Sequence, residues 1–416
     1  MSKFNLIVIG GGPAGLMAAG QASARGLKVL VLEKKHLPAR KLGITGKGRC
    51  NLTNTATHKS FLNAFANGAS FMRFALGRFD SEHLVAFFKN LNVNMVEERG
   101  GRVFPASQQA SEIVRSLIKW ARDMGVTIMT DSRAGRLVIE DNSVKGLSIH
   151  GPDDTQFIEV QQIIIATGGC SYPATGSTGD GYRLAREAGH NIITPCPALV
   201  PLETQDNKVH QMQGLSLRNV QADLLIDDKK KTGLFGEMLF THFGVSGPII
   251  LTMSRTAVQA LMNKHKVTLR VDLKPAVDHA QFKQRIARVM HQQGKKKISN
   301  ILKEFLPLKM IPVFLEQSCI DPDKPGNAVN NKEQKMLRLW CKELLIKITG
   351  YRSFNEAIVT SGGVDLKEVN PKTMESRKVK GLYFAGEVLD VDADTGGFNL
   401  QAAFSTGWVA GNSVGH

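Results

Sequence analysis

The chain is predicted to be an α/β protein with a Rossmann-like dinucleotide-binding domain, a parallel sheet with a small antiparallel meander, interrupted by an inserted β-rich plus helical domain. Three observations support this prediction. An apolar run at residues 4–9 ends in a glycine-rich turn. The same pattern of strand-like runs and glycines returns after Phe354, and the block between the two segments has a different pattern. We therefore expect the dinucleotide-binding domain at residues 1–190 and 350–416, with the inserted domain at 191–349.

The chain opens with a βαβ unit. Residues 4–9 predict a buried strand, and residues 28–32 predict a second one. Residues 13–25 between them are rich in alanine and predict a helix that Gly26 caps. The string GGGPAG at residues 10–15 joins the first strand to this helix and contains the pattern G-x-G-x-x-G. These elements stand in the order that a dinucleotide-binding unit requires.

Each glycine of the pattern has its own physical role. Gly10 permits a tight turn, Gly12 lets the backbone approach a pyrophosphate, and Gly15 lets the helix lie close to the strand. The free N–H groups and the positive dipole at the helix start favour phosphate binding. Glu33 ends the second strand, where a carboxylate can accept hydrogen bonds from a ribose diol. The pattern predicts a dinucleotide cofactor without deciding which one.

The rest of the first segment alternates helices with short strands. A phenylalanine-rich region with N-cap candidates at Asp80 and Ser81 is expected to be helical, and the pair Gly100-Gly101 is expected to turn a hairpin. In chain order, we predict helices over 60–91, a hairpin over 93–104, an amphipathic helix over 107–124, three short strands between 126 and 160, and a buried strand over 163–166.

The inserted block is expected to be β-rich over 191–274 and helical over 275–349. In the β-rich part, Ser246 is an N-cap candidate with Pro248 in the first helical turn. One stripe of the helical part is formed by Leu337, Trp340, Leu344 and Ile348.

The net charge of the chain is +16, and most of the excess falls in the inserted block. Two lysine runs stand out there, at residues 229–231 and 295–297, and no aromatic residues interleave with them. A basic surface attracts polyanions, but a single-strand stacking platform would need aromatic side chains. We interpret the basic charge as solvated loops and compensation of an anionic cofactor, and keep nucleic acid as an alternative partner.

Composition excludes several classes of protein. The five cysteines form no C-x-x-C pair, which argues against a disulfide framework, a disulfide reductase and a zinc site, so we expect no metal. No apolar run reaches the length of about 18 residues that a membrane span needs. The opening apolar run is too short for a signal peptide. We expect a cytoplasmic protein that acts on a small molecule and has no membrane partner.

Three further glycine-rich segments favour FAD over NAD as the dinucleotide. Exposed N–H groups in a second glycine-rich loop, with cationic side chains beside it, suit a cofactor that continues past the pyrophosphate. The segments are Gly43–Asn51 with Arg40 and Lys41 before it, residues 165–169 followed by 176–181, and residues 381–387 followed by 395–401.

These motifs together resemble a known group of flavoproteins. The G-x-G-x-x-G turn, the ATGG strand end and the GLYFAGE strand are similar to the FAD domain of the glutathione-reductase and succinate/fumarate-reductase superfamily. More narrowly, the chain resembles the bacterial BaiN-like (YhiN-type) flavoproteins over essentially its whole length. The strings that carry this resemblance are Gly43–Asn51, THFGVSGP at 241–248, VTSGGV at 359–364 and the segment 386–401.

The resemblance implies where FAD would bind. The start of the closing helix is expected beside the isoalloxazine, because reduced flavin is anionic near N1 and a helix N-terminus stabilises that charge. The implied residues are Gly10, Gly12, Ala14 and Gly15 at the pyrophosphate; Glu33 and Lys34 at the adenosine ribose; Arg40, Lys41, Gly48, Arg49, Cys50 and Asn51 on the flavin side; the backbone of Ala134 at the adenine; Gly168 in the second segment; Gly386 and Glu387 at the ribityl chain or phosphate; and Gly397, Asn399 and Leu400 at the isoalloxazine.

The expected activity is that of an FAD-dependent oxidoreductase. The resemblance implies hydride transfer from flavin N5 to a small-molecule acceptor, such as an activated carbon–carbon double bond. The inserted block lacks a second G-x-G-x-x-G, so we expect either that NAD(P)H binds transiently or that the electrons come from another donor. Two alternatives stay open: a flavin-dependent RNA-modifying enzyme that uses the basic insertion, and a flavin-binding protein without turnover.

No catalytic acid or base is identified from the sequence, and three candidates keep two interpretations each. Cys50 is either a redox thiol or a residue packed against the cofactor. His242 is either a proton donor to the substrate or part of a turn. Arg102 either meets an anionic substrate or belongs to the hairpin turn.

Overall fold

The computed structural model describes residues 4–65, 67–151 and 155–415. These residues divide into two compact units, one formed by Met1–Pro197 with Ala357–His416 and the other by Ala198–Glu356. The chain therefore leaves the first unit once and returns to it, where we expected an insertion at 191–349. Each unit has its own hydrophobic core.

The centre of the first unit is a parallel sheet. Its strands are β1 (Leu6–Ile9), β2 (Val29–Leu32), β6 (Thr127–Met129), β10 (Ile163–Ile165) and β20 (Leu382–Phe384). They lie in the order β20-β10-β1-β2-β6, and each neighbouring pair is parallel. Apart from β6 at the edge, the strands are fully buried apolar runs, as expected of a sheet that is covered on both faces.

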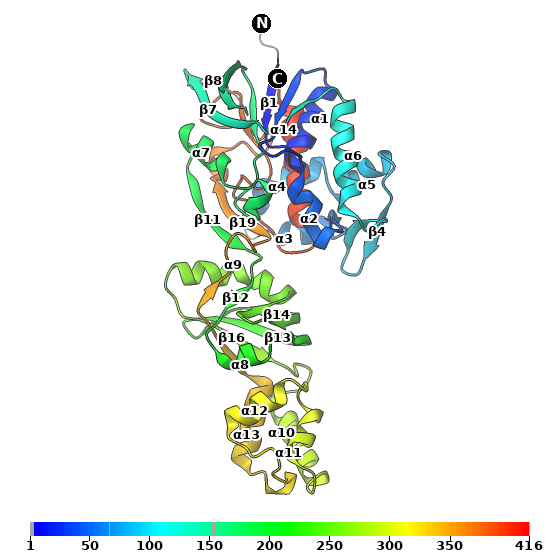
Figure 1. The fold of residues 1–416 in the computed structure, drawn as a ribbon, viewed down its shortest axis with the longest axis vertical. Helices are drawn as coiled ribbons and strands as arrows, with labels where there is room; N and C mark the ends of the chain where they lie inside the picture. Colours follow the sequence, from blue (N-terminus) through cyan, green and yellow to red (C-terminus); the bar gives the residue numbers. More distant parts are fainter. Residues whose placement is uncertain (1–3, 66, 152–154, 416) are drawn as a thin grey trace. The chain divides into compact units, whose positions relative to one another are not determined.

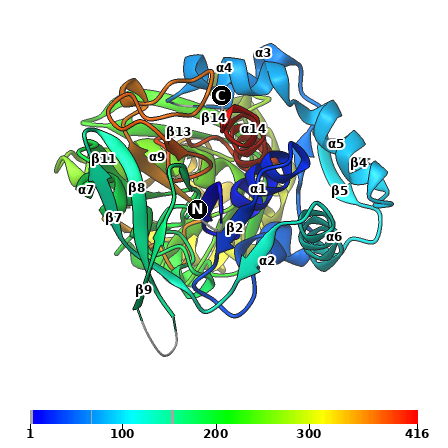
Figure 2. The same cartoon turned by 90° about the horizontal axis from the view of Figure 1, so that it is seen from above.

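Two helices from opposite ends of the chain, α1 (Pro13–Ala24) and α14 (Phe398–Ser413), lie side by side (Figure 1 and Figure 2). A Cβ on Gly407 would lie 2.3 Å from the carbonyl oxygen of Ala14, and one on Gly411 would lie 2.3 Å from that of Ala18. Glycine at these two positions is therefore what allows the helix backbones to approach so closely. This contact brings the two ends of the chain to one place.

Smaller elements complete the first unit. They are α2 (Arg40–Gly48), β3 (Thr53–Asn54), α3 (His58–Asn63), α4 (Ala69–Arg78), α5 (Ser81–Asn90), β4 (Met95–Glu98), β5 (Arg102–Pro105), α6 (Ala110–Asp123), β7 (Arg133–Glu140), β8 (Ser143–His150), β9 (Thr155–Glu159), α7 (Asp180–Glu187), β11 (Ile192–Ala198) and β19 (Val359–Val364). The strands β7-β8-β9 form an antiparallel meander, β3-β5-β4 form a small sheet, and β11 pairs with β19. Helix α6 packs on α1, where the Trp120 ring covers Gly20.

Most elements predicted for this unit are present and one predicted N-cap is confirmed, whereas one strand and one loop need correction. Asp80 caps α5, since its Oδ1 accepts a hydrogen bond from the His83 N–H at 3.0 Å. The strand β6 was missed, because only three strands were expected between residues 126 and 160; its three residues are partly exposed and carry no continuous apolar run. The prediction of a second glycine-rich loop was also wrong in part, because the beginning of this segment forms helix α2.

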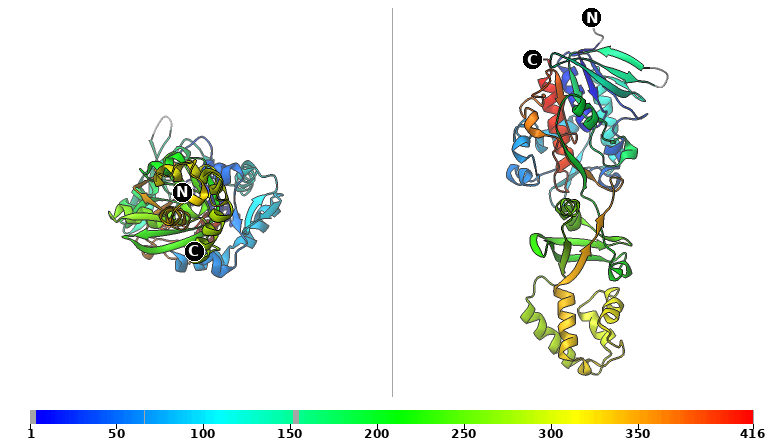
Figure 3. Two further views of the ribbon diagram at one scale, coloured as in Figure 1. Left: turned by 90° about the horizontal axis from the view of Figure 1, so that it is seen from below. Right: turned by 90° about the vertical axis from the view of Figure 1, so that its left-hand side faces the viewer.

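The second unit is an antiparallel sheet with helices. Its strands are β12 (Leu202–Glu203), β13 (Ser216–Ile226), β14 (Lys229–Phe240), β15 (Gly244–Ser246), β16 (Val267–Asp272), β17 (Leu344–Ile348) and β18 (Gly350–Tyr351). Its helices include α8 (Asn207–Gln211), α9 (Pro248–Met262), α10 (His279–Gln292), α11 (Ile298–Ile301), α12 (Met310–Ser318) and α13 (Asn331–Lys342). The strand order is β17-β16-β13-β14-β15-β12-β18, and α9 packs on β13 and β14. In Figure 3, helices α10–α13 form a yellow layer beside the green strands of this unit.

The predicted helical stripe over residues 337–348 was wrong at its end. Residues 344–348 form β17, which pairs with β16, and its buried residues are Leu344, Ile346 and Ile348. A spacing of four residues fits one face of a helix and also every second residue of a strand. The apolar spacing therefore could not distinguish the two.

The predicted cap of α9 was also wrong. Ser246 belongs to β15, and the N-cap is Gly247. Its φ is +97°, a backbone conformation that residues other than glycine rarely adopt. A Cβ on Gly247 would lie 2.8 Å from the Cα of Met238. Pro248 does occupy the first turn, as its missing N–H allows.

The described residues contain neither a helix fit to cross a membrane nor a metal-ligand cluster. None of their helices combines the length and apolar character that crossing a membrane requires. Nor do those residues contain a group of three or more histidine, cysteine, aspartate or glutamate side chains placed to hold a metal ion.

Candidate functional site

The candidate site lies at the carboxyl edge of the parallel sheet. Gly10 follows β1 and Glu33 follows β2. Gly168 and Gly386 lie just beyond the ends of β10 and β20. Because these strands are parallel and in register, their turns gather along one edge, which is where open α/β sheets bind nucleotides. Candidate residues from distant parts of the sequence therefore meet here.

The first turn contains glycines that the fold requires and one that it does not. A Cβ on Gly15 would lie 1.9 Å from the Gly10 carbonyl oxygen, and one on Gly10 would lie 2.5 Å from the Ala166 carbonyl oxygen. A Cβ on Gly12, in contrast, would meet no described atom within 4 Å. The fold itself thus gives no reason for glycine at this position. Open space there fits the close approach of a pyrophosphate to the backbone.

Helices α1 and α14 both begin without a side-chain cap in the described part of the chain, after Gly12 and Gly397 respectively. Neither first turn contains an acidic residue, and Ala14 in the first turn of α1 is buried. A Cβ on Gly397 would lie 2.4 Å from the Thr53 carbonyl oxygen, so strand β3 lies against the start of α14. Uncapped N–H groups and positive helix dipoles suit phosphates and the anionic side of a reduced flavin. The residues therefore fit FAD.

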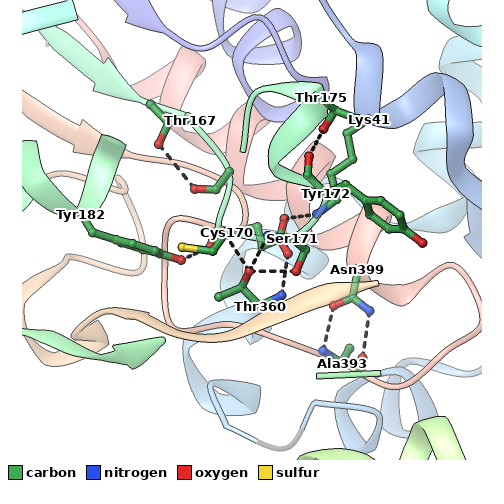
Figure 4. A network of polar contacts seen from close by, with 12 residues as sticks. Lys41, Thr167, Cys170, Ser171, Tyr172, Thr175, Tyr182, Thr360, Ala393 and Asn399 are labelled. Carbon is green, nitrogen blue, oxygen red and sulfur yellow. Dashed lines mark hydrogen bonds and ion pairs between the residues drawn. The ribbon is translucent and has the colours of Figure 1, made fainter. Parts of the chain in front are cut away.

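The Asn399 side chain is engaged by the protein itself. Its Oδ1 accepts a hydrogen bond from the Ala393 N–H at 2.8 Å, and its Nδ2 donates to the Ala393 carbonyl at 2.8 Å (Figure 4). The Nδ2 also donates to the Asp394 carbonyl at 3.2 Å. Asn399 and Leu400 were implied beside the isoalloxazine. Both stand in the first turn of α14, so their backbone N–H groups remain for that role.

Glu33 is tied to the first turn. Its Oε2 accepts a hydrogen bond from the Gly11 N–H at 3.1 Å, and its Oε1 accepts one from the Lys35 N–H at 2.9 Å. Burial raises the pKa of this carboxyl group above its ordinary value, against the lowering effect of these hydrogen bonds. The side chain stands where a ribose diol is expected, and it also orders the protein backbone.

Asp180 contacts a predicted site residue, Lys34, and was not itself predicted from the sequence. Its carboxylate pairs with Lys34 at 2.7 Å and with Arg133 at 2.7 Å. Burial alone would raise its pKa, but the hydrogen bonds from Lys34 and Arg133 outweigh burial and lower it. The available signal was an acidic residue opening a helix after the second glycine-rich turn. Lys34, which the resemblance implies at the adenosine ribose, is therefore held by a residue from another segment of the chain, Asp180.

Ala134 and Gly168 lie near this end of the site. Ala134 is buried on β7, and its carbonyl oxygen accepts a hydrogen bond from Arg183 at 3.3 Å. Gly168 has a φ of +72°, and a Cβ there would lie 3.1 Å from the Ser177 hydroxyl. The carbonyl of Ala134 therefore already has a protein partner, and Gly168 lies against the turn that precedes α7.

A polar network joins α2 to the ends of β10 and β20 (Figure 4). The Lys41 ammonium pairs with Glu387 Oε2 at 2.8 Å, and Glu387 Oε1 accepts a hydrogen bond from the Thr360 N–H at 2.8 Å. The Thr360 hydroxyl accepts from the Cys170 N–H at 2.8 Å and the Ser171 N–H at 3.1 Å. Lys41 and Glu387, both implied cofactor residues, are therefore brought together.

The segment after Arg40 changes from a helical turn to left-handed backbone. Gly46, Lys47 and Gly48 have φ values of +57°, +59° and +83°. Successive residues of this kind expose backbone N–H groups that can face an anion. Arg40 is half-buried at the start of this segment.

Cys50 is fully buried at the end of the same segment. Burial raises the pKa of its thiol to about 12, so the thiol stays protonated at neutral pH. A redox or nucleophilic role needs the thiolate. The structure therefore favours the interpretation of Cys50 as a packed residue.

Asn51 and Arg49 face different neighbours. In the amide orientation that satisfies both ends, Asn51 donates to the Thr53 carbonyl at 3.2 Å and accepts from the Gly397 N–H at 3.2 Å. Arg49 pairs with Glu98 at 2.7 Å and lies 4.1 Å above the centre of the Phe104 ring. Asn51 thus contacts the start of α14, whereas the Arg49 guanidinium is directed to the hairpin.

A groove of about 680 Å³ opens between α3 and α5. Its apolar lining includes Phe61, Leu76 and Val85, and its polar lining includes His58 and Lys89. The Phe61 ring packs edge to face against the ring of Phe398, the first residue of α14, at 4.8 Å. Phe61 therefore lines the groove and also contacts the first residue of α14.

His242 belongs to the second unit. It stands exposed in the turn between β14 and β15, where the Thr241 N–H donates to the Gly244 carbonyl at 2.8 Å. The neighbouring Phe243 ring lies beneath Arg352, 4.7 Å from its guanidinium carbon. These contacts account for the turn and give His242 no assigned role.

Comparisons with known proteins agree with this architecture. A family model described as the HI0933-like protein Rossmann domain matches residues 4–413. The 3-dehydro-bile acid delta(4,6)-reductase of Clostridium scindens is 33% identical over 98% of this chain and 98% of its own. The ribosomal RNA dihydrouridine synthase of Escherichia coli is 29% identical over 100% of this chain and 98% of its own.

Solved structures share the fold at low sequence identity. A 3-ketosteroid-delta4-(5alpha)-dehydrogenase from Rhodococcus jostii RHA1 has a TM-score of 0.54 and 15% identity, covering 99% of this chain and 96% of its own. A 3-ketosteroid delta1-dehydrogenase from Sterolibacterium denitrificans has a TM-score of 0.54 and 12% identity, covering 99% of each chain. At such identities the likeness is evidence of the fold alone.

Proposed function

The chain belongs to the HI0933-like family and is an FAD-dependent oxidoreductase, and on this premise we propose that it reduces a carbon–carbon double bond conjugated to a carbonyl group. The observation that carries the proposal is the pair of relatives that match 98% and 100% of this chain. One name describes reduction of a 3-dehydro steroid at delta(4,6), and the other describes formation of dihydrouridine. Both reactions add hydrogen across a double bond next to a carbonyl.

Bound FAD supplies a two-electron hydride donor for this chemistry. The proposed cradle is the backbone at Gly12 with the uncapped start of α1 for the pyrophosphate. The uncapped start of α14 would stabilise negative charge on the reduced ring system. The ion pair between Lys41 and Glu387 joins α2 to the turn after β20. It would hold this part of the cradle in place.

The hydride would reach the flavin from NAD(P)H bound for a short time, or from another reductant. This part of the proposal is supported by the single G-x-G-x-x-G of the chain, at Gly10–Gly15. A stopped-flow reduction by NADH and by NADPH tests it, and flavin that is bleached by dithionite but by neither nucleotide would point to another donor.

The reductase proposal is tested with anaerobically reduced holoenzyme. We would mix it with a 3-oxo-4-ene steroid, with the saturated 3-oxo steroid, and with a steroid alkene that lacks the carbonyl. The proposal predicts that the conjugated compound alone restores the yellow absorbance of oxidised flavin and gains two hydrogens by mass. Equal, slow reoxidation by all three compounds would contradict it.

A second candidate is reduction of uracil in RNA. It is favoured by the net charge of +16 and by the Escherichia coli relative named a ribosomal RNA dihydrouridine synthase. The two lysine runs support it less, because Lys230 already pairs with Asp223 at 2.8 Å and Lys297 with Asp323 at 2.9 Å. Reoxidation of the reduced flavin by an unmodified ribosomal RNA transcript, with binding that weakens as salt rises, would select this candidate.

A further inference from the structure

Arg102 stands in the middle of the small sheet β3-β5-β4. It lies opposite Asn54 on one neighbouring strand and opposite Glu98 on the other. Residues directly opposite one another in an antiparallel pair project from the same face, so these three side chains share one face of the sheet. Phe104 is two residues along the same strand and shares this face as well.

The guanidinium of Arg102 is only partly engaged. Its Nε donates to the Arg99 carbonyl at 3.1 Å, and one terminal nitrogen lies 3.7 Å from Glu98 Oε2. A separation of 3.7 Å is longer than a hydrogen bond. The side chain is 45% exposed, so, as far as the described residues go, its terminal N–H groups stay open to an incoming acceptor.

A second guanidinium lies on the same aromatic ring. Arg49 is 4.1 Å from the centre of the Phe104 ring, and Arg102 is 5.8 Å from it. Arg49 makes the short ion pair with Glu98, at 2.7 Å. Two guanidinium groups therefore share one carboxylate, and the cluster keeps an excess positive charge. We call Arg49, Glu98, Arg102 and Phe104 the arginine cluster.

The arginine cluster is connected to the start of α14. The Asn54 Nδ2 donates to the Gly100 carbonyl at 3.0 Å and to the Gly396 carbonyl at 3.0 Å. A Cβ on Gly101 would lie 2.7 Å from Asn54 Oδ1, so the hairpin turn fits tightly against this side chain. Asn54 is buried and therefore a fixed bridge. The hairpin that carries Arg102 is thus held next to the helix start assigned above to the flavin.

We propose that the arginine cluster binds an anionic group of the substrate, a carboxylate or a phosphate, with Arg102 as the contacting residue. A guanidinium forms two parallel hydrogen bonds with either group, and the Arg102 guanidinium lies 5.8 Å from the centre of the Phe104 ring. The inference rests on the proposed reductase function and adds the charge of the substrate. It also changes the role of Arg49, from a cofactor residue to the partner that occupies Glu98 and leaves Arg102 open.

The test measures how oxidised holoenzyme distinguishes charged from neutral probes. Perturbation of the flavin spectrum would be titrated with cholate and its methyl ester, and with uridine 5′-monophosphate and uridine. We expect one charged probe to bind about tenfold more tightly than its neutral partner, the effect of one charge-assisted hydrogen-bonded contact. The pair that shows the difference identifies the anion as a carboxylate or a phosphate.

The variants separate a specific contact from general charge. Arg102→Ala is expected to abolish the preference for the charged probe, and Arg102→Lys to keep part of it. Arg99→Ala removes the same charge from the same hairpin and is expected to leave the preference intact. Glu98→Gln is expected to increase it, because the carboxylate no longer competes with the ligand.

Two results would overturn the inference. Equal binding of charged and neutral probes by the wild-type holoenzyme would do so, as would equal losses in Arg102→Ala and Arg99→Ala. The FAD content of every variant is measured in the same samples and identifies any variant that fails to fold. If the enzyme reduces the conjugated steroid but shows no charge preference, this inference fails and the reductase proposal stands.

Discussion

Two of the glycine-rich segments of the first unit, residues 10–15 and residues 40–51, are held in place by different means. The first segment is packed mainly backbone against backbone, since a Cβ on Gly15 would lie 1.9 Å from the Gly10 carbonyl oxygen, and one side chain from outside it, Glu33, accepts a hydrogen bond from the Gly11 N–H. A segment of this kind is recognisable in the sequence, because the spacing of its glycines is itself the constraint.

The second segment is held by side chains from elsewhere in the chain. Lys41 pairs with Glu387, which is 346 residues away, and Arg49 pairs with Glu98, which is 49 residues away. Its glycines mark left-handed backbone, but its position depends on these partners. The difference teaches that the parts of a binding site fixed by backbone contacts can be derived from the sequence. The parts fixed by side chains from elsewhere in the chain can be placed only once the fold is known.

The largest effect is expected from Gly15→Ala. We expect a loss of about 3 kcal/mol or more in the free energy of unfolding, because the new methyl group would overlap the Gly10 carbonyl. Gly77→Ala is the matched control; its Cβ would meet no described atom within 4 Å, and it should stabilise α4 by about 0.5–1 kcal/mol. Urea unfolding followed by circular dichroism measures both. Equal stability of the two variants would refute backbone fixation of the first segment.

A smaller effect is expected for the tether of the second segment. A double-mutant cycle with Lys41→Met and Glu387→Gln should give a coupling of about 1 kcal/mol in urea unfolding, because both side chains are largely buried. The control cycle uses Lys119→Met and Asp123→Asn, an ion pair that is 2.6 Å long but largely exposed, and its coupling should be close to zero. Similar coupling in the two cycles would mean that the Lys41 pair does not hold the segment.

The smallest effect concerns pH and the two carboxylates at the adenosine end. The pKa of Glu33 is raised by burial, so its ionisation costs stability, and the cost disappears as pH falls through that raised pKa toward its ordinary value of 4.5. The pKa of Asp180 is lowered, so it adds stability above its ordinary value of 3.8 and loses it as pH falls through the lowered pKa.

The variants Glu33→Gln and Asp180→Asn should therefore respond to acid with opposite signs. On acidification, the wild type should gain stability relative to Glu33→Gln and lose stability relative to Asp180→Asn. The measurement is the free energy of unfolding in urea at each pH. If the stability difference between wild type and variant changed with pH in the same direction for both variants, the direction of the pKa shift assigned to one of the two carboxylates would be wrong.

Much of the fold follows from local patterns in the sequence. The βαβ unit, the hairpin at Gly100-Gly101 and the α6 helix each have a pattern of glycine or apolar spacing that only one structure satisfies. The strand β17 did not, because Leu344 and Ile348 fit a strand and a helix equally well. The pairing with β16 decided between them, and pairing is a long-range property.

The candidate site was predictable to a similar extent. The glycines of the first turn stand where the pattern places them, whereas the engagement of the Asn399 side chain by Ala393 and of Lys34 by Asp180 depends on neighbouring loops. A sequence gives the kind of side chain at a site. It does not show which partner in the protein already occupies that side chain.

FAD binding by the first turn depends most on Gly12, beside which the described residues leave open space that we assign to the pyrophosphate. The direct measurement is the FAD content per chain of purified Gly12→Val beside Gly77→Val, with urea unfolding of both apoproteins. Neither Cβ would meet a described atom within 4 Å, so both apoproteins should fold with similar stability. We expect Gly77→Val to hold one FAD per chain and Gly12→Val to hold none. Stoichiometric FAD in folded Gly12→Val would contradict the assignment of this turn to the cofactor.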